Sequence, residues 1–208
     1  MGITERKERE KQARINLIKK SARIMFQKKG FEAAKMEEIA EHAEISKATI
    51  YKYFKSKDDL FYEMMQEHLT KLYKDLVEIR TRQKDPEKTI KLIIEETYNF
   101  YRKYSDIYHL VTGLKSSEIK KLLPADKAGN LKVIMASNLK QLELTLKDGI
   151  EKRIFRRIEP MVGAVILWNM FMGIVKYQEN RLDVGKKDYR KSTLDAGVDL
   201  LLWGLKKR

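Results

Sequence analysis

Residues 36–54 read MEEIAEHAEISKATIYKYF and hold two short runs with helical spacing. The first run places its apolar side chains on one face, at Met36, Ile39, Ala40 and Ala43. A three-residue break then ends at Ser46, a residue type that commonly caps a helix N-terminus. The second run, residues 47–54, is rich in Lys, Thr and Tyr. Two short helices joined by a tight turn are the pattern of a helix-turn-helix.

A longer helix is expected before this pair, over residues 11–29, with Gly30 as its C-terminal stop. Packing of the three helices would bury their apolar residues and leave Lys47 and Lys52 facing outward. A DNA major groove, about 12 Å wide, admits such a helix. The alternative is an ordinary three-helix subdomain with a solvated basic face.

The rest of the chain keeps the helical period, and no segment shows the sustained alternation of a strand. Ser56–Asp59 reads as a capping box that opens a long helix toward Arg82. Further helices are expected at residues 86–104, 105–122, 124–153, 160–180 and 188–206. The predicted fold class is therefore all-α, with about nine helices.

The charge of the chain is high and uneven. Its 208 residues carry a formal net charge of +14, and residues 1–57 hold half of that excess. Hydrophobic residues still make up 43%, which is enough for a core and excludes disorder. A basic module at residues 1–57, joined to a more neutral helical body at residues 58–208, is the simplest organisation. The charge indicates a polyanionic partner, either nucleic acid or an anionic membrane surface.

Catalytic and metal-binding patterns are missing from the sequence. The chain has no cysteine, so it has no disulfide, thiolate metal site or Cys nucleophile. His42, His68 and His109 are isolated and lack metal-ligand spacing. Ser117–Lys120 matches S-x-x-K by chance, because the partner motifs are missing. We expect no catalytic residue, no metal and no cofactor, and hence no enzyme.

Targeting signals are also missing. Residues 1–20 are charged throughout and have no apolar core of a signal peptide. The longest apolar stretch, Met161–Val175, contains Asn169 and is shorter than the about 20 residues of a spanning helix. We expect a soluble, cytoplasmic protein with no membrane partner.

Four short stretches within the first 60 residues have the spacing of a known family. They are Gly30-Phe31, Ile39-Ala40, Ile45-Ser46-Lys47-Ala48-Thr49-Ile50-Tyr51-Lys52-Tyr53-Phe54 and Ser56-Lys57-Asp58-Asp59-Leu60. The set resembles the TetR family of bacterial repressors. That family's pattern reads Gly-aromatic, Ile-Ala, Val-Ser-x-Gly-Thr-Leu-Tyr-x-Tyr/His-Phe and Ser/Asn-Lys-Glu-x-Leu. The match spans about 30 positions with fixed spacing, so it is specific.

The resemblance implies an N-terminal three-helix helix-turn-helix DNA-binding domain and a C-terminal helical domain for ligand binding and dimerisation. It implies a ligand-responsive transcriptional regulator, usually a repressor, that binds a pseudo-palindromic operator in double-stranded DNA as a homodimer. A small, largely apolar effector would release it. The alternative is a basic helical protein of membrane surfaces, or a non-specific nucleic-acid-binding protein, without an effector.

The resemblance also implies which residues meet DNA. Lys47, Ala48 and Lys52 would face base edges, whereas Lys57 would meet a phosphate beside the backbone amides of its helix. The full implied set is Lys35, Ser46, Lys47, Ala48, Thr49, Tyr51, Lys52, Tyr53 and Lys57. Basic residues from Arg6 to Arg14 are either an arm for the minor groove or a solvated extension of the first helix.

Three positions depart from the family's pattern. Glu44 stands where the family usually has Gly, so it must adopt a turn conformation that Gly favours, at about 1 kcal/mol. Ala48 replaces a Gly of the recognition helix and offers a methyl group to thymine. Ala34-Lys35 replaces the Thr or Ser that caps the second helix, so that cap is lost.

Residues 161–175 are apolar nearly all round, which predicts burial on every side and, with a second apolar stripe, a dimer interface. The expected interface residues are Val165, Phe171, Leu194, Val198, Leu201, Leu202 and Leu205. The alternative is one larger core within the chain. For the effector, the resemblance and the soft, aromatic composition indicate a pool of candidates. This pool is Tyr98, Tyr101, Tyr104, Tyr108, Met135, Asn138, Trp168 and Met172.

Overall fold

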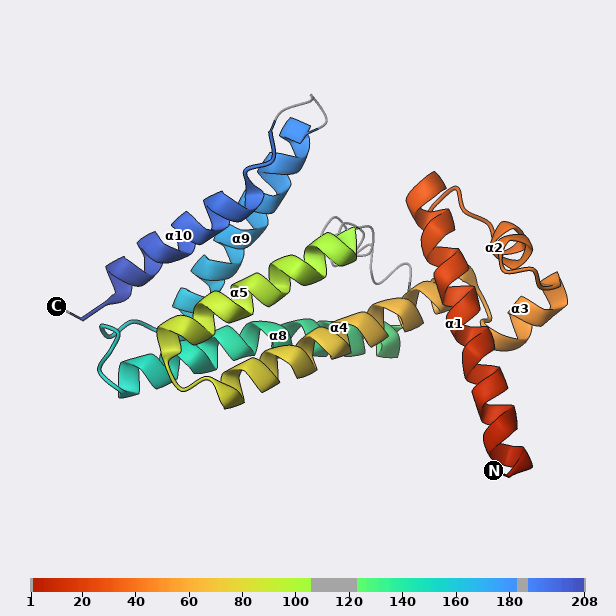
Figure 1. Cartoon of the computed structure of the whole chain (residues 1–208), viewed down its shortest axis with the longest axis horizontal. Coiled ribbons are helices and arrows are strands. Elements are labelled where there is room, and N and C mark those ends of the chain that lie inside the picture. The colour runs from red at the N-terminus through yellow and green to blue at the C-terminus, as the bar shows by residue number, and fades with distance from the viewer. Residues whose placement is uncertain (1, 106–122, 183–186, 208) are drawn as a thin grey trace. The chain divides into compact units, whose positions relative to one another are not determined.

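The computed structural model describes residues 2–105, 123–182 and 187–207, and these residues form eight helices without a strand (Figure 1). The predicted all-α class is confirmed. The helices are α1 (Ile3–Lys29), α2 (Met36–His42), α3 (Lys47–Tyr53), α4 (Lys57–Arg82), α5 (Pro86–Lys103), α8 (Ala125–Glu151), α9 (Pro160–Leu182) and α10 (Arg190–Leu205). The expected helix at 105–122 lies almost wholly outside the described residues.

The chain divides into two compact units, each described by itself. The described residues of 1–68 and 104–131 form one unit, called the head unit here. Those of 69–103 and 132–208 form the other, called the body unit. A functional boundary after residue 57 stays a prediction.

The core of the head unit forms where α1, α2 and α3 bring their apolar faces together. Three aromatic rings lie at its centre, with Phe31 4.9 Å from Phe61 and 5.3 Å from Phe26 between ring centroids. Other buried side chains of this core are Ile18, Ala22, Ile39, Ala40, Ile50 and Phe54. Gly30 ends α1 with a φ of 78°, a backbone conformation in which a Cβ is costly. The chain can therefore turn sharply into α2.

The first helix is longer than the sequence predicts, because it begins at Ile3 rather than near residue 11. Its first three turns are exposed, and local contacts hold them. Arg6 pairs with Glu10 at 2.8 Å, and the backbone N–H of Gly2 donates to Glu5. Such i,i+4 pairs stabilise a helix without tertiary packing. The basic stretch from Arg6 to Arg14 is therefore a helical extension of α1.

In the body unit, α9 and α10 pack together, and α10 also packs on α5 (Figure 1). The C-terminal end is fastened to the loop after α8, because Arg156 donates its N–H to Leu205 O at 2.8 Å and Lys207 donates to Ile154 O at 3.0 Å. The expected end of α8 near residue 153 is corrected to Glu151, since Arg153 adopts a φ of 60° and leaves the helix. The remaining helix ends lie within two residues of their predicted positions.

Among the described residues, one helix is long and apolar enough, by length and composition, to cross a membrane. Its 18-residue window, Pro160–Tyr177, has a mean hydropathy of 1.3 and is 28% buried within the chain. This exceeds the 15 apolar residues counted from the sequence, because the window tolerates polar residues at its ends. The core helix of a soluble protein has the same composition, so the observation by itself is weak.

Candidate nucleic-acid interface

The turn between α2 and α3 is built as the sequence predicts. Glu44 has a φ of 52°, the conformation that the family's usual Gly adopts without cost. The backbone N–H of Ile45 donates to Ala40 O at 3.0 Å and closes the turn. Ser46 then caps α3, because its Oγ accepts the N–H of Thr49 at 3.1 Å. These local contacts set the direction in which α3 leaves the turn.

The outer face of α3 is open. Lys47, Ala48, Tyr51 and Lys52 are exposed, while Thr49 and Tyr53 are half-buried. The core prediction is confirmed for the opposite face, because Ile50 and Phe54 are buried. Ser46 is exposed as well, yet its hydroxyl lies 2.8 Å from that of Thr49. The exposed side chains therefore offer two ammonium groups, a phenol and a methyl group on one short helix.

Lys47 has an acidic partner that the sequence analysis missed. Its Nζ lies 2.6 Å from Glu37 Oε1 on α2. The hydrogen bond that Lys47 donates to Glu37 holds the pKa of Glu37 below its ordinary value and raises the pKa of Lys47. Glu37 is the second residue of α2, and only the packing angle of the two helices brings it beside Lys47. Both groups are charged at neutral pH.

The N-terminus of α2 lacks the Thr or Ser cap of the family and is stabilised by other hydrogen bonds. Lys35 occupies the cap position and makes no side-chain cap hydrogen bond. Instead the Glu38 carboxylate accepts the Lys35 N–H at 3.2 Å and the Lys29 ammonium at 2.8 Å. The cap is lost as expected, and Glu38 replaces part of it. The Lys35 side chain is exposed at this end of the helix.

Lys57 is occupied within the chain. Its Nζ donates to Phe31 O at 2.7 Å and to Glu32 O at 2.9 Å, and it lies 4.6 Å from the centroid of the Phe31 ring. The side chain therefore fastens the segment after α1 to the first turn of α4. A phosphate contact by Lys57 stays a prediction. A phosphate there would have to share the Lys57 ammonium with the carbonyl groups of Phe31 and Glu32.

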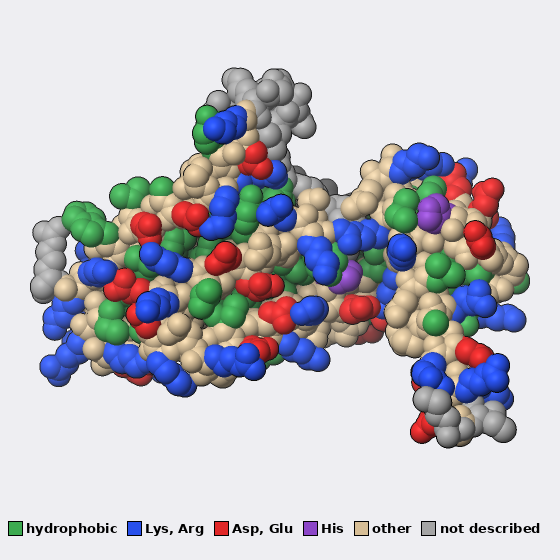
Figure 2. Space-filling view, viewed as in Figure 1, with side chains coloured by type: hydrophobic (Ala, Val, Ile, Leu, Met, Phe, Trp, Pro, Cys, Tyr) green, Lys and Arg blue, Asp and Glu red, His purple; other side chains and the backbone are tan. Residues whose placement is uncertain are grey.

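Charge on the head unit is mixed rather than uniformly basic. Figure 2 shows acidic side chains among the Lys and Arg side chains on this face of the unit, with basic side chains also at the exposed end of α1. The charge on this face therefore does not by itself mark a uniformly basic surface for a polyanion.

The described members of the expected effector pool are divided between the two units. Tyr98 and Tyr101 stack in the body unit, with ring centroids 6.1 Å apart. Tyr104 belongs to the head unit, where it stacks on His68 at 4.1 Å. Tyr108 lies outside the described residues. Among the other candidates, Asn138 is buried, and Met135, Trp168 and Met172 are half-buried.

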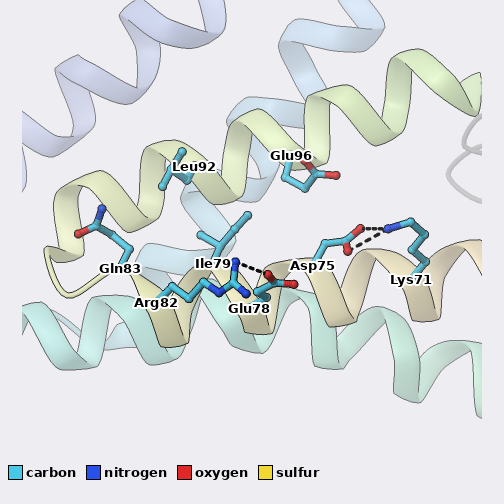
Figure 3. Close-up of a pocket in the computed structure, with 8 residues that line it drawn as sticks. All are labelled: Lys71, Asp75, Glu78, Ile79, Arg82, Gln83, Leu92 and Glu96. Carbon is cyan, nitrogen blue, oxygen red and sulfur yellow. Dashed lines mark hydrogen bonds and ion pairs between the residues drawn. The ribbon is translucent and has the colours of Figure 1, made fainter.

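Two hollows of the body unit are lined mainly by residues with charged or polar side chains, none of them from this pool. The first, of about 570 Å³, lies between α4 and α5 (Figure 3). Figure 3 shows the ion pairs that line it, Lys71 with Asp75 and Arg82 with Glu78. The second, of about 480 Å³, is bordered by α4, α5 and α8. Neither is lined by a member of the pool, and neither has the apolar lining that the sequence analysis expects.

The expected dimer residues divide by burial. Phe171, Leu194, Val198, Leu202 and Leu205 are buried within the chain, so they serve the core that the sequence analysis kept as its alternative. Val165 is exposed and Leu201 is half-buried. Other large apolar side chains, which are not among the expected interface residues, are exposed on α9 and α10. They are Met161, Val162, Ile166, Leu200 and Trp203.

No group of three or more His, Cys, Asp or Glu side chains that could hold a metal ion occurs among the described residues.

Comparison with known proteins finds similarity in both sequence and fold. The profile of the family described as "Bacterial regulatory proteins, tetR family" matches residues 18–64. The HTH-type transcriptional repressor NicS of Pseudomonas putida is 24% identical over 206 residues, which cover 93% of this chain and 92% of NicS. This alignment extends through both units.

Two solved structures share the fold. The TetR family transcriptional regulator PfmR from Thermus thermophilus has a TM-score of 0.74 and 23% identity, covering 91% of this chain and 99% of its own. The transcriptional regulator FadR from Bacillus subtilis, solved in complex with stearoyl-CoA, has a TM-score of 0.72 and 16% identity. That match covers 91% of this chain and 98% of FadR.

Proposed function

Because the chain belongs to the TetR family of bacterial transcriptional regulators, we propose that it represses transcription by binding a pseudo-palindromic operator as a homodimer. The observation that carries the proposal is the outer face of α3. Lys47, Ala48 and Lys52 are exposed there, on a short helix whose start is set by the Glu44 turn and the Ser46 cap. Such a helix can enter a major groove with its side chains against base edges.

Lys52 tests this docking more directly than Lys47, which is paired with Glu37. Within the described part of the chain, the Lys52 side chain forms no ion pair or hydrogen bond. The duplex would be selected from a random pool by the parent protein. Lys52→Ala should then bind it about 10-fold more weakly and lose preference at one position of each half-site. Lys28→Ala, in the last turn of α1, removes the same charge away from α3 and should keep the preference. Unchanged sequence preference in Lys52→Ala would contradict the docking.

We propose that the homodimer forms through the apolar surface that α9 and α10 leave exposed. Val162, Ile166 and Leu200 are each about half exposed or more, and their helices pack together in one unit. A patch of this kind marks an interface in a protein that stays in solution. Two-fold symmetry would then present two copies of α3 to half-sites about one helical turn apart, 34–36 Å.

Sedimentation at micromolar concentration should show a dimer. A monomer that binds anionic liposomes but not DNA would favour the membrane-surface alternative.

We propose that an apolar effector releases the operator, as the family resemblance implies. FadR was solved with stearoyl-CoA, and an acyl thioester combines a long hydrocarbon chain with a polar headgroup. Tyr98 and Tyr101 supply aromatic surface in the body unit, and Asn138 Oδ1 is buried without a hydrogen-bond partner among the described residues. Buried acceptors of that kind cost free energy until a donor arrives, so Asn138 is a candidate contact for a ligand N–H or O–H.

The effector proposal is tested by thermal shift with acyl-CoA esters, the matching free fatty acids and coenzyme A alone. An apolar effector should raise the melting temperature with increasing chain length. Because linkage is reciprocal, operator duplex should lower the affinity for the effector by the same factor by which the effector lowers the affinity for the operator. If none of these compounds stabilises the protein, the proposal is contradicted. It is also contradicted if the affinity for the compound is the same with and without operator DNA.

A further inference from the structure

The first turns of α4 and α8 are joined by a set of contacts inside the head unit. Asp59 on α4 and Lys127 on α8 form an ion pair, with side chains 19% and 26% exposed. The Lys127 ammonium lies 4.8 Å from the centroid of the Tyr62 ring. One turn later, Asn130 Nδ2 donates to Tyr62 Oη at 2.8 Å. These contacts connect segments that lie 68 residues apart in the chain.

The two carboxylate oxygens of Asp59 have different partners. Oδ1 accepts the Lys127 ammonium, whereas Oδ2 accepts the backbone N–H of Lys55 at 3.0 Å. Lys55 lies in the short segment between α3 and α4, and Ser56 Oγ in turn accepts the N–H of Asp59 at 3.1 Å. Asp59 therefore connects α8 to the turn that follows the recognition helix.

The charge state of this carboxylate suits such a connection. Burial raises the pKa of Asp59, but hydrogen bonds from Lys127 and from the Lys55 N–H outweigh it and hold the pKa below its ordinary value. Asp59 is thus ionised at neutral pH, and both of its hydrogen bonds are charge-assisted and strong. Loss of Lys127 would leave a partly buried charge with one of its two partners gone.

We propose that Asp59 and Lys127 form a latch through which the position of α8 sets the orientation of α3. The latch rests on the proposed function, since it regulates the same DNA-reading helix. Asp59 occupies the variable position of the family's Ser/Asn-Lys-Glu-x-Leu pattern, so the family motif does not imply this contact. It is a property of this chain.

The helix α8 is the element that can carry a signal to the latch. It continues from Lys127 to Met135 and Asn138, two candidates for effector contact, within about three helical turns. Withdrawal of the first turn of α8 from α4 would break the pair between Lys127 and Asp59. Release of Lys127 would then loosen the α3–α4 turn and lower operator affinity.

The test compares full-length variants by amide hydrogen exchange and by binding to a duplex selected from a random pool by the parent. Lys127→Met keeps the side-chain stem over Tyr62 but removes the charge. Exchange of the amides of residues 54–57 should quicken by about 10-fold, and operator affinity should fall by a similar factor. Lys127→Arg should restore both values. Lys147→Met removes the same charge from the other end of α8 and should match the parent.

The exchange pattern separates the latch from general destabilisation and from failure of the proposed function. Unchanged exchange at residues 54–57 in Lys127→Met would overturn the latch. Exchange that quickens equally along the whole chain would also overturn it, because the effect would then be a loss of global stability. A parent protein that selects no duplex would refute operator binding, while the exchange measurement would still decide whether Lys127 holds the turn.

Discussion

Lys47, the first residue of the recognition helix, forms an ion pair with Glu37 of α2 at 2.6 Å. If Lys47 reads DNA as proposed, the neighbouring Glu37 carboxylate would repel phosphates and hold the ammonium in one direction. Binding to arbitrary DNA would then break the ion pair between Lys47 and Glu37 without replacing it. At a matching site, a base edge can replace the Glu37 carboxylate as the acceptor of the Lys47 hydrogen bond. Glu37 is in this view a determinant of specificity.

Glu37→Gln should therefore raise affinity for random duplex more than affinity for the operator. Freed from its partner, Lys47 would contact one more phosphate, and the slope of log affinity against log salt should steepen by about 1. Glu41→Gln removes the same charge from the exposed side of α2 and serves as the control. Equal salt slopes in the two variants would show that Glu37 acts only through net charge.

Lys57→Met should lower the stability of the protein as well as its DNA affinity. The change removes two hydrogen bonds to the carbonyl groups of Phe31 and Glu32, each worth about 1 kcal/mol or more for a charged donor. Lys55→Met removes a neighbouring exposed charge and should leave the melting temperature unchanged. Lost DNA affinity with an unchanged melting temperature would instead assign Lys57 to phosphate binding alone.

Leu200→Glu should convert the dimer into monomers that bind operator weakly. The Leu200 side chain is 71% exposed on α10, so a charge at this position should hardly change the stability of one chain. The same charge buried in an apolar dimer interface would be strongly destabilising. Val133→Glu places the same charge at a similarly exposed apolar position on α8 and should leave the dimer intact. Sedimentation of both variants distinguishes the interface from a general effect of added charge.

Gly149→Ala should destabilise the protein, although alanine favours helices. A Cβ at this position would overlap the buried ring of Phe155, and overpacking of this kind costs about 1–3 kcal/mol. Gly129 lies in the same helix with open space around its Cα. Gly129→Ala should therefore stabilise by up to about 1 kcal/mol. Chemical denaturation measures both, and the two changes should have opposite signs.

Glu96→Gln should stabilise the protein at neutral pH but not in acid. Burial, followed by the nearby Asp75 carboxylate, raises the pKa of Glu96 in the folded chain. An acid whose folded pKa is raised destabilises the fold once it ionises, and this penalty develops as pH rises through the unfolded pKa and the folded one. Parent and variant should thus melt alike near pH 3.5, and the variant should melt higher at pH 7. A constant difference at both pH values would assign the effect to packing.

Local features of this chain could be predicted from the order of its residues. Ser46 caps α3, Glu44 adopts the positive φ of a turn, and Gly30 ends α1, because each depends on neighbours within about four positions. The same reasoning correctly predicted the all-α class, since helical periodicity is a local property. The start of α1 was placed too late because its exposed turns lack the apolar face by which a helix is recognised.

Contacts between distant segments had to come from the tertiary structure. Periodicity marks Phe171 and Val165 as equally apolar, yet Phe171 is buried in its own chain and Val165 is exposed. Similarly, Glu37 and Asp59 look like ordinary helix acids until packing brings Lys47 and Lys127 beside them. The physical reason is that hydrogen-bonded turns and caps close within a few residues, whereas the partner of a helix face depends on how whole helices pack.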